Sequence, residues 1–308
     1  MDTINTFEIV ELVNGGMSAR IVVNMGNTLF SLCSDKDEKI YFPYSLPEYK
    51  SNTKLAGNPF MHPWANRLEG DYIQLQNQQH VFPEECKPFL YRDGNGLPLH
   101  GLLLKSDRWK TIEITRNTHV AEFIFRTPDL TAIFPYEHTI QIRHELTKNG
   151  IYIETILLNH DEKPMPVSFG FHPYFLIRPE RRADYRLTIP AEEAIEVNDV
   201  MIPTGKFSPK TSRWNFYGDH VYLQGAAFDD GFHRLKRNGA NEAEFALNEL
   251  QIIVDENYPF AQIYAPDNIE KPYVCIEPMT AATNALNTGT CPQLSPGEVF
   301  RAGFKMVE

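Results

Sequence analysis

Hydrophobic and polar residues alternate along much of the chain with the two-residue period of a half-buried β-strand. The pattern is clearest in residues 140–146 and 151–157, where Ile, His, Thr and Leu occupy every second position. Asn149-Gly150 lies between these stretches, and this dipeptide is the strongest short-range signal for a β-hairpin. We therefore predict two antiparallel strands that are joined by a tight turn.

The same alternation predicts strands in both halves of the chain. The predicted strand segments are residues 7–34, with turns at 14–16 and 25–27, and residues 112–125, 183–200, 219–228 and 244–266. Short helical turns are expected at 241–249 and 280–288, and no stretch keeps a helical period long enough for a major helix. Two sheets packed face to face would bury the alternating apolar positions. We therefore predict an all-β sandwich in which residues 1–308 form a single domain.

Other stretches have neither period and are expected to form loops. Residues 35–58 are charged and then rich in proline and asparagine. Residues 58–70 contain two prolines, which exclude a regular helix or central strand. A further irregular stretch ends at residue 102, and segments 35–58 and 80–98 are candidates to close over a site.

The composition supports a large β-rich core and excludes some partners. The chain has 308 residues, 42% of them hydrophobic, and its 22 Pro, 18 Gly, 14 Tyr and 20 Phe favour strands and turns over long helices. The net charge of −11 argues against nucleic acid and against an anionic membrane surface as partners. No His, Asp or Glu cluster has metal-ligand spacing, so no metal site is expected.

The termini and the cysteines favour a cytoplasmic protein. Residues 1–8 lack the basic and apolar regions of a signal peptide, and no apolar run reaches transmembrane length. The four cysteines, at positions 33, 86, 275 and 291, form no close pair of the zinc or redox kind. We expect reduced thiols and a monomer or homodimer.

Two ionisable residues interrupt apolar stretches that otherwise read as buried core. His172 follows Val167-Ser168-Phe169-Gly170-Phe171, and Glu277 follows Tyr273-Val274-Cys275-Ile276. Proline comes directly after each of them. Because proline cannot continue a central sheet ladder, we expect both residues at strand ends. A histidine and a carboxylate that face each other across a cleft form an acid–base pair.

Several motifs occur together in an order that resembles a known family of sugar-isomerising enzymes. They are Pro63-Trp64-Ala65-Asn66-Arg67 with Gly70, Leu99-His100-Gly101-Leu102-Leu103, Gly170-Phe171-His172-Pro173-Tyr174-Phe175, Phe228-Asp229-Asp230-Gly231-Phe232, and Ile276-Glu277-Pro278-Met279-Thr280 with Asn284-Ala285-Leu286-Asn287-Thr288-Gly289. In these motifs the chain resembles the aldose 1-epimerase (mutarotase) family. The resemblance implies a large, twisted antiparallel β-supersandwich with few short helices. It also implies an enzyme that interconverts the α and β anomers of a free aldose and needs no cofactor.

The resemblance places Glu277 at the family's general base, His172 at its general acid and His100 at the second active-site histidine. Changing an anomer requires a base that removes the proton of the C1 hydroxyl while an acid protonates the ring oxygen. The roles reverse on ring closure, so both pKa values should lie near the working pH. We expect burial to raise the pKa of Glu277, and a carboxylate from Asp229 or Glu277 to raise the pKa of His172.

The remaining candidate residues would hold the sugar. The resemblance places Arg67 and Asp229 at positions that bind sugar hydroxyls, which suits the donor fork of arginine and the acceptor pair of a carboxylate. Asn66 is a further expected substrate contact. Trp64 and Tyr174 would present their rings to the apolar side of a pyranose.

Several of these assignments have alternatives that the sequence leaves open. His172 would also serve as a structural histidine bonded to the backbone, Glu277 as a buried carboxylate paired with an arginine, and His100 as a turn residue beside a glycine. Arg67 would also serve to fasten a loop, and Trp64 fits the core as well as it fits a sugar platform. Either Asp229 or Asp230 would point inward. We favour Asp229 because it follows the apolar Phe228 in the family's register.

The substrate and the reaction class also have alternatives. Glucose or galactose is the default aldose, and an epimerase of a phosphorylated or otherwise modified hexose is the nearest rival. Arg178, Arg181 and Arg182 are candidate phosphate ligands for that rival. A non-catalytic sugar-binding protein would not need both an acid and a base. A glycoside hydrolase usually uses two carboxylates, for which Asp229 and Glu277 are the candidates.

Overall fold

The hairpin predicted around Asn149-Gly150 lies within the largest sheet of the protein. The computed structural model describes the following residues: 7–35, 37–75 and 78–308. The hairpin strands are β10 (His138–Leu146) and β11 (Gly150–Asn159). They pair antiparallel along their whole length, and every second side chain is buried, as the alternation predicts.

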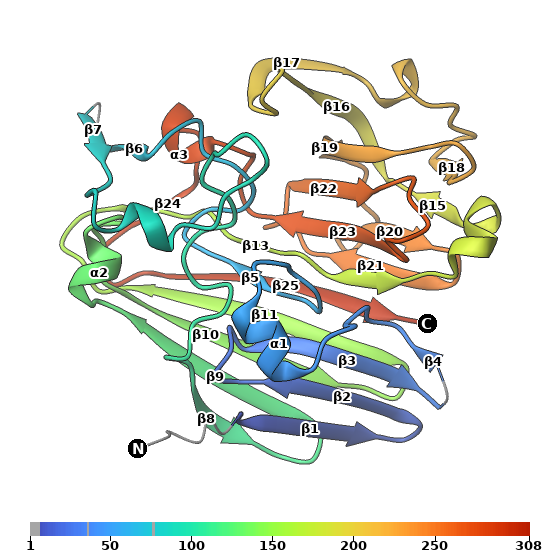
Figure 1. Ribbon diagram of the computed structural model, residues 1–308, viewed down its shortest axis with the longest axis horizontal. Helices are drawn as coiled ribbons and strands as arrows, with labels where there is room; N and C mark the ends of the chain where they lie inside the picture. The colour runs from blue at the N-terminus through green and yellow to red at the C-terminus, as the bar shows by residue number, and fades with distance from the viewer. Residues whose placement is uncertain (1–6, 36, 76–77) are drawn as a thin grey trace.

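The largest sheet has nine strands in the order β18-β15-β20-β21-β25-β11-β10-β9-β8. The other members of this sheet are β8 (Lys110–Ile114), β9 (Thr118–Phe125), β15 (Arg186–Thr188), β18 (His220–Tyr222), β20 (Ala243–Leu247), β21 (Leu250–Val254) and β25 (Val299–Val307). All of its pairs are antiparallel. Its long strands β8 to β11 and β25 run across the lower half of the molecule in Figure 1.

A second sheet of eight strands has the order β17-β16-β19-β22-β23-β13-β5, with β14 also paired to β23. Its strands are β5 (Phe60–Met61), β13 (Gly170–Phe171), β14 (Tyr174–Leu176), β16 (Ala191–Val197), β17 (Pro203–Pro209), β19 (Phe228–Leu235), β22 (Phe260–Ala265) and β23 (Tyr273–Met279). The rings of Phe171 on β13 and Phe304 on β25 lie 5.1 Å apart, so the two large sheets share one apolar core. The fold is therefore the all-β, antiparallel supersandwich that the sequence predicts.

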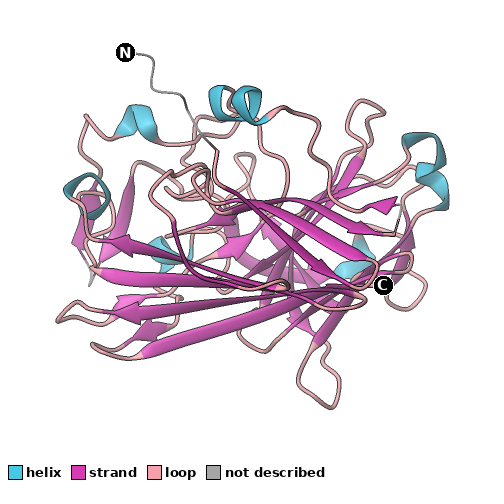
Figure 2. Ribbon diagram, turned by 90° about the horizontal axis from the view of Figure 1, so that it is seen from below, coloured by secondary structure: helices cyan, strands magenta, loops and turns pink. Residues whose placement is uncertain are grey.

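Smaller sheets and short helices surround the two large sheets. The small sheets are β1 (Ile9–Asn14), β2 (Met17–Val22), β3 (Thr28–Ser34) and β4 (Asp37–Glu38); β6 (Tyr72–Leu75) with β7 (Gln78–Val81); and β12 (Met165–Pro166) with β24 (Gln293–Leu294). The helices are α1 (Leu46–Ser51), α2 (Pro128–Thr131), α3 (Ala285–Thr288) and the 3-10 turns η1 (Lys87–Phe89), η2 (Pro179–Asp184) and η3 (Lys210–Ser212). In Figure 2 several of the helices lie at the edges of the molecule, outside the strands. Across the described residues, no helix combines the length and the apolar character needed to cross a membrane.

Two local predictions were wrong, and one was confirmed. The segment 35–58 contains helix α1, which begins with a capping box in which Ser45 and Glu48 bond each other's backbone amides. The helical turn expected at 241–249 is instead β20 and its turn, because burial of every second residue favours a strand. The turn expected at 280–288 contains α3, as predicted.

Buried histidines are a marked feature of the core. The following histidines are at most 5% exposed: His62, His100, His119, His138, His144 and His172. Nε2 of His62 lies 2.8 Å from Nε2 of His138. Burial lowers the pKa of all six, to about 4 for His119 and His138 and to about 3 for His172.

We predict that acid weakens this fold before its carboxylates are protonated. The unfolded chain binds protons at these histidines from about pH 6.5 downward, whereas the folded chain stays unprotonated there until much lower pH. Each histidine then removes up to about 1.4 kcal/mol of unfolding free energy per pH unit. Urea denaturation at about pH 7 and about pH 5 measures the loss. The variant His138→Phe should show a shallower pH dependence, and an unchanged wild-type midpoint would contradict the prediction.

Candidate active site

Three neighbouring strands of the second sheet present polar side chains on one face. They are β19, β22 and β23, which carry Asp229, Gln262 and Glu277 in that order. Gln262 lies opposite Glu277, and Asp229 lies opposite Tyr264, two residues along from Gln262. Opposite residues share a face and side chains alternate along a strand, so these polar groups point into the same space.

The same alternation distinguishes Asp229 from Asp230. Asp229 lines a cavity on this face, and its Oδ1 accepts a hydrogen bond of 2.7 Å from Nε2 of Gln262. Asp230 follows on the other side of the strand, where its Oδ1 accepts a hydrogen bond of 2.5 Å from Nη1 of Arg213. The structure thus places the aspartate favoured by the sequence at the cavity.

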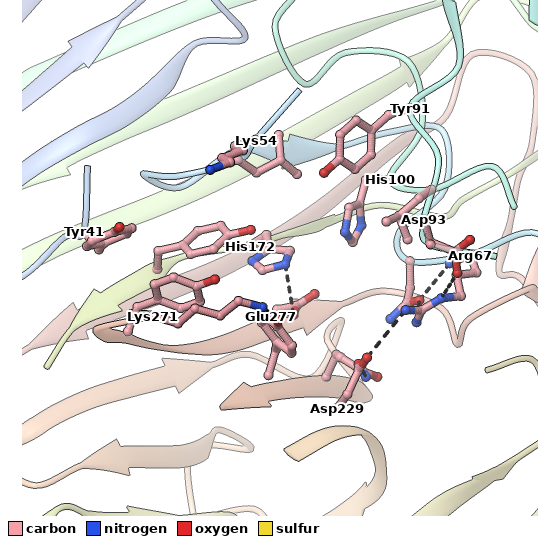
Figure 3. Close-up of a pocket in the computed structure, with 18 of the residues that line it drawn as sticks. Tyr41, Lys54, Arg67, Tyr91, Asp93, His100, His172, Asp229, Lys271 and Glu277 are labelled. Carbon is pink, nitrogen blue, oxygen red and sulfur yellow. Dashed lines mark hydrogen bonds and ion pairs between the residues drawn. The ribbon is translucent and has the colours of Figure 1, made fainter. Parts of the chain in front are cut away.

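His172 lies in the gap between β13 and β14, two short strands that both pair with β23. A Cβ atom on Gly170 would lie 2.5 Å from the carbonyl oxygen of Pro278, so glycine is needed for β13 to approach β23 this closely. The approach brings Nε2 of His172 to 3.3 Å from Oε1 of Glu277 (Figure 3). The two residues singled out by the sequence therefore meet at the cavity floor.

One expectation about these residues was wrong. His172 directly follows the end of β13, as predicted, but Glu277 lies inside β23, which continues to Met279. Pro278 still occupies the ladder, opposite Ala261 of β22. On its other side β23 pairs with β13 at Met279 and with β14 only up to Cys275, so the intervening stretch can include a proline.

The irregular segments that carry Arg67 and His100 form another wall of the cavity. The amide of His100 donates a hydrogen bond of 2.9 Å to the carbonyl oxygen of Asn66. Gly101, at a φ of 74°, passes so close to His62 that a Cβ atom would lie 2.2 Å from its carbonyl oxygen. Asn66 and His100 also adopt left-handed conformations, with φ of 58° and 62°. The backbone thus holds His100 edge-to-face against the imidazole of the acid–base pair, with ring centroids 5.1 Å apart.

Arg67 is fixed by two carboxylates and an amide. Its Nε donates a hydrogen bond of 2.8 Å to Oδ2 of Asp93, and its Nη1 donates one of 3.1 Å to Oδ1 of Asn66. Its Nη2 lies 3.5 Å from Oδ2 of Asp229. The side chain of Arg67 is 13% exposed, so the guanidinium is held in one orientation at the cavity wall.

These walls enclose a cavity of about 530 Å³. Three buried atoms of its lining residues have no hydrogen-bond partner among the described residues: Nδ1 of His100, Nδ1 of His172 and Oε2 of Glu277. Buried polar groups are normally paired, and each exception calls for an explanation. A bound polar molecule would supply the missing partner for Oε2 of Glu277.

Two predicted aromatic contacts behave differently in the structure. Trp64 does not line the cavity, is 1% exposed, and stacks on Phe82 with ring centroids 5.9 Å apart. The prediction that Trp64 serves as a sugar platform was therefore wrong, because its ring belongs to the core. Tyr174 does line the cavity, and its ring stacks on His172 at 4.5 Å with the planes 7° apart.

Two residues of the site were not predicted from the sequence. Gln262 is 4% exposed, and its polar side chain at a buried strand position was the available signal. Asp93 accepts hydrogen bonds from the amides of Asn95 and Leu97, so in sequence it resembles an ordinary turn residue. Its ion pair with Arg67 joins residues that are distant in the chain, which no local pattern reveals.

Burial controls the ionisation of the acid–base pair. Burial raises the pKa of Glu277 well above its usual value, Asp229 adds to that rise, and Arg67 opposes it. Burial lowers the pKa of His172 to about 3 and that of His100 well below its usual value. The expected rise at His172 was wrong, because the cost of desolvating the imidazolium dominates. The resting pair therefore favours a neutral carboxyl group beside a neutral imidazole.

The arginines considered as phosphate ligands lie away from this cavity. Arg178 and Arg181 line a separate surface hollow. Nη2 of Arg182 donates hydrogen bonds to the carbonyl oxygens of Ala226 and Ala265. In the part of the chain that the structure describes, no three His, Cys, Asp or Glu side chains group together as a metal site would require.

Comparison with known families and proteins gives results that agree with this geometry. The family model described as aldose 1-epimerase matches residues 8–306. Among curated proteins, the chain is 22% identical over 228 residues to the uncharacterized protein YihR of Escherichia coli (strain K12), a match that covers 74% of this chain and 70% of that protein.

Solved structures with the same fold include several proteins named for sugar epimerases. A galactose mutarotase-like protein from Clostridium acetobutylicum has a TM-score of 0.79 at 19% identity, over 97% of this chain and 98% of that one. The GalM/aldose epimerase homologue from C. elegans has a TM-score of 0.79 at 16% identity, over 98% of each chain. The galactose 1-epimerase from Lactobacillus acidophilus NCFM has a TM-score of 0.72 at 17% identity, over 100% of this chain and 96% of that one. At these identities the likeness shows a shared fold.

We predict that Glu277→Gln stabilises the protein at alkaline pH. The carboxyl group ionises near pH 4.3 in the unfolded chain but at higher pH in the fold, so Glu277 lowers stability as pH rises through that window. Glutamine removes this effect and should add about 1 kcal/mol or more near pH 8, and less near pH 5. Urea denaturation at both pH values tests this. A loss of several kcal/mol would instead show that Glu277 and His172 form an ion pair in the resting protein.

Proposed function

The chain belongs to the aldose 1-epimerase family, and we propose that it interconverts the α and β anomers of a free aldose by opening and reclosing the sugar ring. The observation that carries the proposal is the 3.3 Å distance between Nε2 of His172 and Oε1 of Glu277 at the buried cavity floor. A hemiacetal carries two oxygens on one carbon, the C1 hydroxyl and the ring oxygen. Two proton-transfer groups this close to each other match that spacing.

Ring opening passes one proton through each member of the pair. As the sugar binds, the single proton of the resting pair moves from Glu277 to His172. Glu277, now the carboxylate, removes the proton of the C1 hydroxyl, and protonated His172 delivers a proton to the ring oxygen. The C1–O5 bond breaks and leaves an open-chain aldehyde with a C5 hydroxyl. After rotation about C1–C2, neutral His172 takes the C5 hydroxyl proton while Glu277 returns its proton to the carbonyl oxygen, and the ring closes on the other face.

This sequence keeps the proton count of the pair constant. The pair holds one proton before ring opening, on the imidazole, and one proton afterwards, on the carboxyl group. Burial disfavours both a doubly protonated and a doubly deprotonated pair, because each would carry a net charge away from water. The buried site therefore suits a reaction that only exchanges a proton between its two groups.

The other cavity residues are proposed to position the sugar. Arg67 and Gln262 present donors to ring hydroxyls, and Asp229 presents acceptors. His100 lies beside His172 with its Nδ1 unpaired among the described residues, and it would bond near the ring oxygen and share the acid role. Asn66 contributes by holding the guanidinium of Arg67.

The contacts of Asp229 favour an epimerase over a glycoside hydrolase. A hydrolase would need a second carboxyl group that is free to donate a proton or attack the sugar. Oδ1 of Asp229 accepts a hydrogen bond from Gln262 and Oδ2 lies 3.5 Å from Nη2 of Arg67, so this carboxylate is held as a hydrogen-bond acceptor and is not placed to donate a proton or attack the sugar. We also propose that residues 1–308 act as one domain, since the family match runs through both large sheets.

The proposal predicts that wild-type protein accelerates anomer exchange and that His172→Ala and Glu277→Gln do not. Loss of either proton-transfer group should lower kcat by about 10²- to 10⁴-fold. Polarimetry or exchange NMR with freshly dissolved α-D-glucose and α-D-galactose measures the rate above the spontaneous one. His160→Ala, which changes an exposed histidine outside the cavity, is the control for the substitution itself. A wild-type protein that leaves both sugars at the spontaneous rate would reject these substrates.

The pH–rate profile should lack an acid limb near the usual histidine pKa. The pair takes up a second proton, on His172, only near the lowered pKa of about 3. The rate of anomer exchange should therefore stay unchanged from neutral pH to well below pH 6. The rate should fall at alkaline pH, as the pair loses its one proton above the raised pKa of Glu277. Initial rates of anomer exchange across the pH range measure both limbs. A fall centred near pH 6.5 would show that His172 titrates as if it were exposed.

A further inference from the structure

The cavity extends beyond the acid–base pair to an end that anomer exchange alone does not use. From His172 the lining passes to Tyr174, which packs edge-on against Tyr273 with ring centroids 4.9 Å apart. Tyr41 follows, with its ring 5.0 Å from that of Tyr273. We call this part of the cavity, lined by tyrosines and lysines, the tyrosine end.

Figure 3 shows that the tyrosine end lies on one side of His172 and the hydroxyl-binding groups on the other. Tyr41, Lys54 and Lys271 gather on one side, whereas Arg67 and Asp229 lie on the opposite side. The cavity therefore has a carboxylate-rich end and a lysine-bearing end, with the reacting groups between them.

The two ends differ in how their positive charges are balanced. Arg67 is neutralised by ion pairs with Asp93 and Asp229. Within the described residues, neither Lys54 nor Lys271 forms an ion pair with a carboxylate. The tyrosine end therefore carries cations without counterions, together with phenol hydroxyls that can donate hydrogen bonds.

The lysines of the tyrosine end are supported by their surroundings. Nζ of Lys271 donates a hydrogen bond of 2.8 Å to the hydroxyl of Tyr264. The backbone that carries Lys54 is anchored by Lys105, whose Nζ donates a hydrogen bond of 3.0 Å to the carbonyl oxygen of Lys54. Glu270 also lines this end, but it is exposed and has the opposite charge, so it opposes the effect of the two lysines.

The connectivity of a pyranose places a particular atom at the tyrosine end. The ring oxygen is bonded to C5, and C5 carries C6. If His172 serves the ring oxygen while Arg67 and Asp229 hold hydroxyls on the far side, C6 projects past His172 toward the lysines. A group on C6 that only accepts hydrogen bonds would match their ammonium groups and the phenol donors.

We infer that the tyrosine end binds an oxyanion on C6 of the aldose, a phosphoryl, sulfonyl or carboxyl group, with Lys54 and Lys271 as its cationic partners. The inference rests on the proposed epimerase function and specifies its substrate class. It predicts that an aldose with a charged C6 group is a better substrate than the matching neutral aldose.

The test compares kcat/KM for anomer exchange of glucose 6-phosphate, glucuronate and glucose, followed by exchange NMR. For wild-type protein we expect at least one charged sugar to exceed glucose by roughly tenfold, as two partly exposed ion pairs would give. In the double variant Lys54→Gln, Lys271→Gln the ratio of charged to neutral sugar should fall by about the same factor. The sugar that shows the larger ratio identifies the anion, and inorganic phosphate as an inhibitor tests whether the anion binds alone.

Two single variants sharpen the result. Lys148→Gln changes an exposed lysine outside the cavity and should keep the wild-type ratio. Glu270→Gln removes the opposing charge and should raise the ratio.

If wild-type protein accelerates glucose with no preference for a charged sugar, the inference fails and the proposed function stands. If no sugar is accelerated, the proposed function fails. Calorimetric titration with glucose 6-phosphate then tests the tyrosine end separately, and absence of lysine-dependent binding would overturn the inference too.

Discussion

The burial of one histidine against one glutamate is the constraint on which the site depends. His172 and Glu277 are 5% and 1% exposed, with their nearest polar atoms 3.3 Å apart. Out of water the carboxyl group resists ionisation and the imidazole resists protonation, so the pair is most stable with one proton between them. Such a site opposes folding, and the apolar core shared by the two large sheets must outweigh that cost.

The fold meets this constraint by dividing the site between rigid strands and close-packed loops. Strands β19, β22 and β23 set Asp229, Gln262 and Glu277 in register on one face. Two glycines then allow chain approaches that a side chain would block, Gly170 against β23 and Gly101 against the carbonyl of residue 62. Main-chain packing therefore fixes the backbone positions of the site residues, and their side chains reach the cavity from those positions.

The strands and the two buried ionisable residues were predictable because their signals are local. Burial of every second residue is written directly into the strand sequences, and His172 and Glu277 stand out as ionisable groups in apolar runs. The wall around Arg67 was less predictable, because an irregular segment has no period to show which side chains face inward. Thus Trp64 belongs to the core although Arg67, three residues later, lines the cavity. The partnership with Asp93 depends on a loop contact that only the folded chain creates.

The charges around the pair also explain why Arg67 is accompanied by two carboxylates. An arginine near Glu277 lowers the pKa of that carboxyl group, whereas the charge of Asp229 raises it. If Arg67 lacked counterions, it would favour loss of the single proton that the pair needs. The negative charges of Asp93 and Asp229, which both pair with Arg67, oppose this influence. Charge balance around Arg67 therefore helps to keep this proton on the pair.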